Sequence, residues 1–345
     1  MTTNSYPVIE IIAELAQGFE GRPEQARLLL RAAAATGADA AKFHLVYADE
    51  LATPDYKYFE LFRSLEMADV VWEELAEYSR ELGIALHFDI FGSRSLALAE
   101  RLGAKAIKVH GTDISNVSLL NQIAQTAIPK IMLGSGGAFL TEIEQAIHLL
   151  TSKELVVFLG FQGYPTPNDV NQIARVGILS NLLSRQTKNF AVGFADHAPP
   201  NSPLRLALAA TALGAGARVF EKHLTLSEVM KMEDHEAALN PDHFAEFVDV
   251  LRDCVNAYGR SSNADDFGMS DAEYGYRKMI RRHVVTQRAI VAGKHIEPED
   301  VALKRSSSEN ALNELSLVYG AIPRRNIEAN KPLAPNDLSD MGDEK

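Results

Sequence analysis

The chain has 345 residues, of which 46% are hydrophobic and 23% charged, and its formal net charge is −12. This composition is typical of globular proteins, and the length favours a large domain followed by a small one. The acidic balance argues against binding to nucleic acid or an anionic membrane, since both need concentrated Lys and Arg. A single cysteine, Cys254, excludes internal disulfides and thiolate metal clusters. The N-terminal residues show neither a signal peptide nor a membrane span, so a soluble cytoplasmic protein is expected.

Short apolar runs alternate with longer segments whose apolar residues recur every three or four positions. The short runs predict eight strands, at residues 8–15, 39–45, 84–90, 104–110, 129–135, 154–161, 189–196 and 217–223. Strands that alternate with helices pair in parallel through right-handed crossovers. Eight such units match a (β/α)8 TIM barrel over residues 1–259. A doubly wound sheet is the competing fold, but no GxGxxG sequence follows any of these strands.

A polar stretch follows the last predicted barrel helix. We interpret residues 260–276 as a linker. Residues 277–345 then contain short strands and turns marked by Gly and Pro, which predicts a second, small domain. A unit of this size is small for independent stability, so it is expected to pack on a barrel, either its own or that of a partner.

Ionisable residues stand at the carboxyl end of nearly every predicted strand, the end at which TIM barrels place their active sites. They are Glu14, Lys42 with His44, His87 with Asp89, Lys108 with His110, Asp196 with His197, and Glu221 to His223, while Gln162 and Tyr164 follow the sixth strand. Hydrophobic burial alone would not select such residues. The sequence therefore predicts a polar pocket at this end of the barrel.

His197 and His223 end adjacent strands and could bind one divalent cation, with carboxylates and waters completing a Mn²⁺- or Mg²⁺-like shell. The alternative is that each imidazole is only hydrogen-bonded. Lys42 and Lys108 could hold a carboxylate or phosphate. They could instead pair with nearby acids, Asp89 among them, or one could form a Schiff base.

Several motifs occur in order along the chain. They are "IAELAQGFEG", "GADAAKF", "YPTPNDVN", "VGFADHA", "FEKHLTL", "EDHEAALNP" and, near the C-terminus, "IVAGKHIEPEDVALKR". Together they resemble the N-acetylneuraminate (sialic acid) synthase family over nearly the whole chain. The resemblance implies a TIM barrel followed by an antifreeze-like (SAF) domain. It also implies condensation of phosphoenolpyruvate with an N-acyl amino sugar, N-acetylmannosamine or a related one, to a nonulosonic acid and phosphate.

The resemblance also implies roles for single residues. His197 and His223 match the metal ligands, and Glu14 and Asp234 match acids that hold the sugar, with Tyr164 beside it. Lys42 and Lys108 match lysines on the phosphoenolpyruvate side. Arg305 matches an arginine of the antifreeze-like domain that reaches the partner's site in a domain-swapped homodimer. Further substrate contacts are expected from Gln162, Thr112, Ser135, Asp196 and Glu221.

The chain departs from the family pattern at several positions that would bind phosphate. The altered positions include Asp89, Gly111, Gly134 and Ala195, where hydroxyl groups are lost or a charge is gained. A carboxylate beside a phosphate is repulsive, and each lost neutral hydrogen bond costs about 0.5–1.5 kcal/mol. Three hypotheses remain. Phosphoenolpyruvate binds in a rearranged site, the donor is another molecule such as pyruvate, or the protein binds a sugar without catalysis.

Overall fold

The computed structural model describes residues 6–259 and 267–339. The chain divides near residue 260 into two compact units, which are described separately. None of the described helices is both long and apolar enough to span a bilayer.

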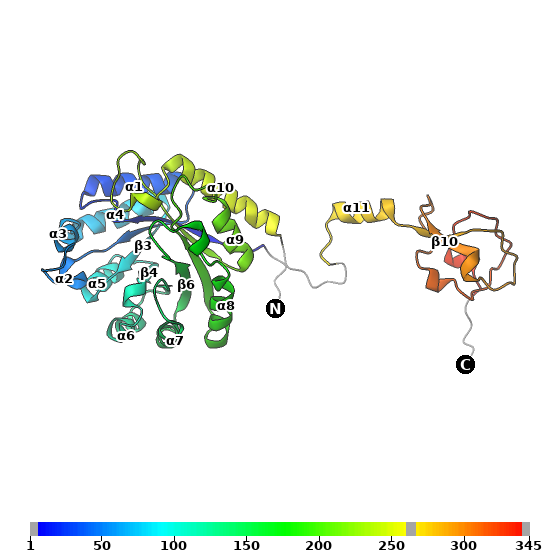
Figure 1. The fold of residues 1–345 in the computed structure, drawn as a ribbon, viewed down its shortest axis with the longest axis horizontal. Helices are drawn as coiled ribbons and strands as arrows, with labels where there is room; N and C mark the ends of the chain where they lie inside the picture. The colour runs from blue at the N-terminus through cyan, green and yellow to red at the C-terminus, as the bar shows by residue number, and fades with distance from the viewer. Residues whose placement is uncertain (1–5, 260–266, 340–345) are drawn as a thin grey trace. The chain divides into compact units, whose positions relative to one another are not determined.

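The first unit is a closed barrel of eight parallel strands surrounded by helices, which confirms the predicted TIM barrel (Figure 1). The strands are β1 (Glu10–Ala16), β2 (Ala40–His44), β3 (Ala85–Ile90), β4 (Ala106–Val109), β5 (Lys130–Gly134), β6 (Glu154–Gly160), β7 (Phe190–Asp196) and β8 (Val219–His223). Each strand pairs with its neighbours in the sequence, and β8 pairs with β1.

The helices of this unit follow the predicted alternation. They are α1 (Pro23–Ala35), α2 (Ala48–Leu51), α3 (Phe59–Ser64), α4 (Asp69–Leu82), α5 (Ser93–Arg101), α6 (Val117–Gln125), α7 (Leu140–Leu149), α8 (Arg175–Gln186), α9 (Ala207–Ala215) and α10 (Pro241–Tyr258). Helix α4 shows why they form: it buries Trp72, Leu75 and Ala76 on one face. It ends at Gly83, whose φ of 72° is in the left-handed region that favours glycine.

Alternate residues of each strand face the barrel interior, because side chains on a strand alternate between its two faces. The middle of the interior is an apolar layer that includes Ile12, Met132, Val156 and Val219. The intervening residues pack outward against the helices, as Phe43 and Phe220 do. This period of two places every second residue at the strand ends in the barrel mouth.

Three polar side chains, Glu10, His87 and Lys130, fill the amino-terminal end of the barrel interior. The Glu10 carboxylate lies 3.1 Å from His87 Nε2 and 2.8 Å from Lys130 Nζ. Burial would raise the pKa of Glu10, but His87 and Lys130 outweigh it and lower that pKa to about 2. The carboxylate is therefore ionised at neutral pH and stabilises the fold.

Glu10→Gln should lower the free energy of unfolding of the barrel by about 2 kcal/mol at pH 7, after allowance for partial exposure. A depressed carboxyl pKa stabilises above the unfolded value of 4.5 and loses that effect as the pH falls towards 2. The difference between wild type and variant should therefore shrink by roughly half or more at pH 3. Urea unfolding of both proteins at pH 7 and pH 3 measures this difference in the free energy of unfolding. Glu154→Gln is the matched control, since Glu154 pairs with the same Lys130 but is 41% exposed. An equal loss in both variants would contradict the prediction.

The predicted linker lies partly outside the described residues, and its described part contains the start of α11 (Asp271–Ile280). In the second unit, β9 (His283–Thr286) pairs antiparallel with β10 (Val301–Lys304). Val284, Ile290, Val301 and Leu333 belong to its own small apolar core.

Candidate active site

A group of five buried ionisable side chains fills the carboxyl-terminal end of the barrel interior. We call it the Lys42 cluster, and it comprises Glu14, Lys42, Asp89, Lys108 and Glu221. Lys42 Nζ bonds to Glu14 and, at 2.5 Å, to Asp89, and it lies 3.6 Å from Glu221. Lys108 Nζ donates to Glu221 at 2.6 Å and lies 3.9 Å from Asp89. The lysines thus pair with acids, as the alternative interpretation of the sequence predicts.

Burial alone would shift the pKa of each of these groups towards its neutral form. The interactions between the lysines and the acids shift most of these pKa values in the opposite direction. Asp89, Glu14 and Glu221 outweigh burial and raise the pKa of Lys42. In the same way the two lysines hold the pKa of Asp89 and of Glu221 below the usual range. Glu14 behaves differently, because burial and the two neighbouring carboxylates raise its pKa to about 8. The cluster therefore carries one acid whose ionisation is unfavourable near neutral pH.

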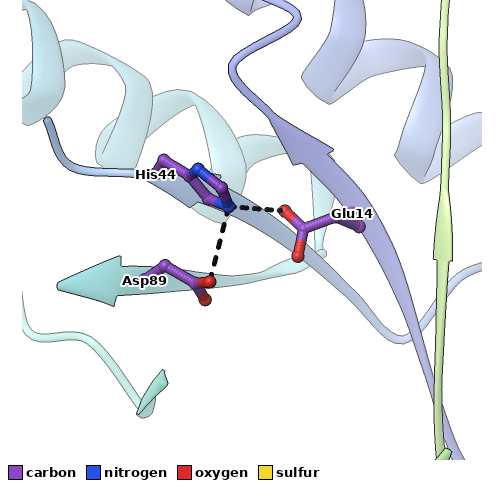
Figure 2. A group of neighbouring side chains, drawn as sticks. All are labelled: Glu14, His44 and Asp89. Atoms are coloured by element: carbon purple, nitrogen blue, oxygen red, sulfur yellow. Dashed lines mark ion pairs between the residues drawn. The ribbon is translucent and has the colours of Figure 1, made fainter. Parts of the chain in front are cut away.

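His44, at the end of β2, lies between two members of this cluster (Figure 2). Its Nε2 atom is 3.4 Å from Asp89 Oδ2 and 4.0 Å from Glu14 Oε1. Burial lowers the pKa of His44 to about 3, so the imidazole is neutral. Within residues 6–259 and 267–339, Glu14, His44 and Asp89 form the one group of three metal-ligand side chains whose donor atoms lie within 4.8 Å of one another. The barrel mouth thus contains side chains that could hold a divalent cation.

His197 and His223 lie at the carboxyl ends of the adjacent strands β7 and β8, with ring centroids 5.3 Å apart and the rings tilted at 53° to each other. His197 Nδ1 lies 3.1 Å from the Ala195 carbonyl oxygen and 3.4 Å from Phe161 N, so both backbone contacts use Nδ1 and Nε2 is left as a ligand atom. Burial lowers the pKa of His197 to about 3 and that of His223 well below its usual value. Two neutral, buried imidazoles at this separation fit a shared cation. His223 is also the register partner of Glu14 across β8 and β1.

Tyr164 and Asp234 close this side of the mouth. The Tyr164 ring lies 5.7 Å from His197 and 5.4 Å from His223, and its hydroxyl donates to the Asp234 carbonyl oxygen. Asp234 Oδ2 accepts a hydrogen bond of 3.2 Å from Gln17 N, which ties the loop after β8 to the end of β1. Burial raises the pKa of Asp234 to about 6. The carboxylate can therefore accept hydrogen bonds from a ligand above that pH.

A pocket of about 380 Å³ opens beside these residues at the ends of β4 to β7. Its lining includes Lys108, Thr112, Gln162 and His197 together with several glycines. These glycines bring the strand ends into close contact. A Cβ atom added to Gly111 would lie 2.3 Å from the Gly136 oxygen, and one added to Gly160 would lie 2.5 Å from the Ala195 Cβ. Backbone thus lines the wall where the family resemblance implies hydroxyl groups.

The remaining predicted substrate contacts do not all lie at the pocket. Ser135 donates its hydroxyl to the Phe158 carbonyl oxygen at 2.7 Å, away from a ligand. Asp196 faces the helix layer, where it accepts from Lys222 Nζ at 3.2 Å and from Ala198 N at 2.8 Å. Thr112 is exposed at the pocket rim, and Gln162 donates to the Asn171 carbonyl oxygen. Arg305 is exposed in the second unit, just after β10.

The sequence placed Glu14, His44 and Asp89 at strand ends without grouping them as possible ligands. The spacing of these residues could have indicated the group. Lys42 and His44 are two residues apart on one strand, as are His87 and Asp89 on the next. Residues two apart face the same side of a strand, so these pairs point inward together. The ring centroids of His44 and His110 lie 6.4 Å apart, a contact that the separate strand-end positions did not predict.

Comparison with known proteins identifies the family of the chain. Residues 29–263 match the NeuB family and residues 281–339 match the SAF domain. The N,N'-diacetyllegionaminic acid synthase of Legionella pneumophila is 28% identical, with 94% of this chain and 92% of that protein covered. The N-acetylneuraminate-9-phosphate synthase of Mus musculus is 25% identical over 85% of this chain and 82% of that protein.

A solved structure, N-acetylneuraminic acid synthetase from Leptospira borgpetersenii, superposes with a TM-score of 0.70 at 22% identity, covering 79% of this chain and 93% of that one. That likeness shows the shared fold. The family match extends over most of the barrel and ends near the point where the SAF match begins. This chain therefore belongs to the NeuB family and carries a C-terminal SAF domain.

Proposed function

We propose that the protein condenses phosphoenolpyruvate with an N-acyl amino sugar, N-acetylmannosamine or a related one, in a cytoplasmic biosynthetic reaction. The products are a nonulosonic acid and phosphate. The observation that carries this proposal is the pair of facing imidazoles, His197 and His223, 5.3 Å apart beside a pocket that contains Lys108. The names of two relatives, synthases of legionaminic acid and of N-acetylneuraminate 9-phosphate, support it.

The reaction forms one carbon–carbon bond. C3 of phosphoenolpyruvate bonds to the aldehyde carbon of the sugar, and the aldehyde oxygen takes up a proton. Water adds at C2, and the departure of phosphate leaves a keto group there. A divalent cation, Mn²⁺ or Mg²⁺, held by His197 and His223 would make the aldehyde carbon more electrophilic.

The protein side chains bind and orient the two substrates. Lys108 lines the pocket and supplies positive charge to the anionic donor. Glu14 and Asp234 accept hydrogen bonds from sugar hydroxyls, and Tyr164 holds the Asp234 loop in place. Lys42 orients Glu14. Gln162, Thr112 and Glu221 supply further contacts, whereas Ser135 and Asp196 are hydrogen-bonded within the protein and support the strand ends instead.

The proposal includes a domain-swapped homodimer, in which Arg305 of each chain contacts substrate in the other subunit's barrel. An arginine suits this role because its guanidinium group recognises carboxylates and phosphates. Arg305 is exposed, as such a contact requires.

A changed donor is the second candidate, and Asp89 favours it. Asp89 is fully buried and forms an ion pair with Lys42. This pair neutralises an ammonium group that could otherwise bind a phosphate. The glycine wall of the pocket also lacks side-chain hydroxyls. Pyruvate needs fewer such groups than phosphoenolpyruvate because it carries no phosphate.

The test is an assay of the full chain with Mn²⁺, phosphoenolpyruvate and N-acetylmannosamine, followed by a panel of N-acyl hexosamines and other aldoses. We expect release of inorganic phosphate in step with formation of a 2-keto acid, and loss of both in chelator. Consumption of pyruvate but not of phosphoenolpyruvate would select the second candidate. Sugars that raise the melting temperature without any turnover would identify a sugar-binding protein and overturn both.

A further inference from the structure

The group of Glu14, His44 and Asp89, here called the His44 triad, joins the ends of three adjacent strands, β1, β2 and β3 (Figure 2). Its donor atoms are separated by 3.4 Å and 4.0 Å from His44 Nε2, and all lie within 4.8 Å of one another. Ligands of an octahedral ion with bonds of about 2.1 Å are separated by roughly 3.0 Å or 4.2 Å. The spacing of the triad falls in this range.

Lys42 contacts one of the two carboxylate oxygens of each acid in the triad. Its ammonium group contacts Glu14 Oε2 and Asp89 Oδ1. The other oxygen of each acid lies on the His44 side (Figure 2), and that of Glu14 also accepts a hydrogen bond of 2.8 Å from Ala16 N. Asp89 is fully excluded from solvent, and its Oδ2 atom has no hydrogen-bond partner among residues 6–259 and 267–339. A buried carboxylate oxygen without a partner is costly, so its position calls for a ligand.

His44 lacks the hydrogen bonds that a buried imidazole would ordinarily make. In the described part of the chain, its Nδ1 atom has no hydrogen-bond partner, and its Nε2 atom has the two acids alone within ion-pair distance. The ring is 13% exposed, which leaves a route from the mouth to the triad. A cation at Nε2 would satisfy one nitrogen of this ring and the unpartnered oxygen of Asp89 together.

We propose that Glu14, His44 and Asp89 bind a second divalent cation, separate from the one proposed at His197 and His223. One imidazole nitrogen and two carboxylate oxygens suit a transition-metal ion such as Mn²⁺, with waters filling the remaining positions. The ion offsets the charge that Asp89 adds to the mouth. It thereby lets an anionic donor approach Lys108 although Asp89 is present. The site binds its ion whether or not the proposed sugar condensation occurs.

The experiment counts Mn²⁺ ions bound to the full chain, by electron paramagnetic resonance of free Mn²⁺ during titration. We expect two ions per wild-type chain. His44→Gln should remove one of them, and Asp89→Asn should weaken the same one by at least about tenfold. His110→Gln is the matched control. It removes a neighbouring histidine of the mouth that lies outside the triad and should leave two ions bound.

Variants at the other site separate this inference from the proposed function. His197→Ala should lose one ion and keep the triad's ion, and the double variant with His44→Gln should bind none. If His44→Gln abolishes the only ion bound and His197→Ala does not, the inference stands and the proposed role of His197 and His223 fails. If the wild type binds a single ion that His44→Gln retains, the inference is wrong.

A second measurement avoids dependence on the folding of any variant. Wild-type crystals grown with Mn²⁺ should give an anomalous difference peak within bonding distance of His44 Nε2 and Asp89 Oδ2. A peak at His197 and His223 with none at the triad would overturn the inference.

Discussion

Lys42→Met should lower the free energy of unfolding of the barrel by about 3–5 kcal/mol at pH 7, the usual cost of removing one partner from a buried ion pair. Lys42 is completely buried and contacts Glu14, Asp89 and Glu221. Without its ammonium group these acids face one another with only Lys108 to offset them. Urea unfolding followed by circular dichroism measures the loss.

The pH dependence of this loss identifies its cause. The raised pKa of Lys42 keeps the wild-type ammonium charged below the unfolded value of 10.5, so its own contribution is constant from acid to neutral pH. In the variant, Asp89 and Glu221 keep Lys108 but lose Lys42, the second of the two lysines that hold their pKa values down, so they take up protons on milder acidification than in the wild type. The destabilisation should therefore shrink between pH 7 and pH 4.5. Lys105→Met, at an exposed position, should change stability little. A loss independent of pH would indicate altered packing instead of unpaired charge.

His197→Ala and His223→Ala should each lower the rate of phosphate release by at least about a hundredfold under the proposed function, because even groups that only support a metal ligand contribute 10- to 100-fold. The two rings are buried, neutral and 5.3 Å apart, so neither can replace the other. The measurement is steady-state phosphate release with Mn²⁺ in excess.

The control is His148→Ala, which removes an exposed histidine of α7 and should leave the rate unchanged. Each active-site variant should also keep the far-ultraviolet circular dichroism of the wild type. Wild-type rates in either folded variant would remove the pair from the reaction.

The fold was predictable because alternating strands and helices leave a strong periodic signal. The predicted strand at residues 189–196, for instance, differs from β7 by one residue at its start. The position of Phe19 could not be predicted in this way, because it lies outside the periodic segments. Its ring is buried against Phe43 and Trp72, with centroid distances of 5.7 Å and 5.4 Å, and belongs to the core between barrel and helices.

The sequence predicted which residues stand at the strand ends, but it did not predict which of their side chains contact one another. The sequence placed Lys42 and Asp89 at neighbouring strand ends, yet whether they meet depends on register, which a short apolar run does not fix. In the structure, β2 and β3 pair Lys42 with His87 and His44 with Asp89, and this brings His44 to the carboxylates. Asp196 illustrates the opposite case. It ends a strand like the others, but the strand's alternation turns it outward to Lys222.

The close contact of backbone at Gly111, Gly136 and Gly160 has a consequence for redesign. A serine at Gly160 would bring its Cβ within 2.5 Å of the Ala195 Cβ, and one at Gly111 would meet the Gly136 oxygen at 2.3 Å. Hydroxyl groups therefore cannot be introduced into this wall by single substitutions, since the ends of the four neighbouring strands are in contact. Changes of donor preference are easier to engineer at Thr112, which is exposed at the rim of the pocket.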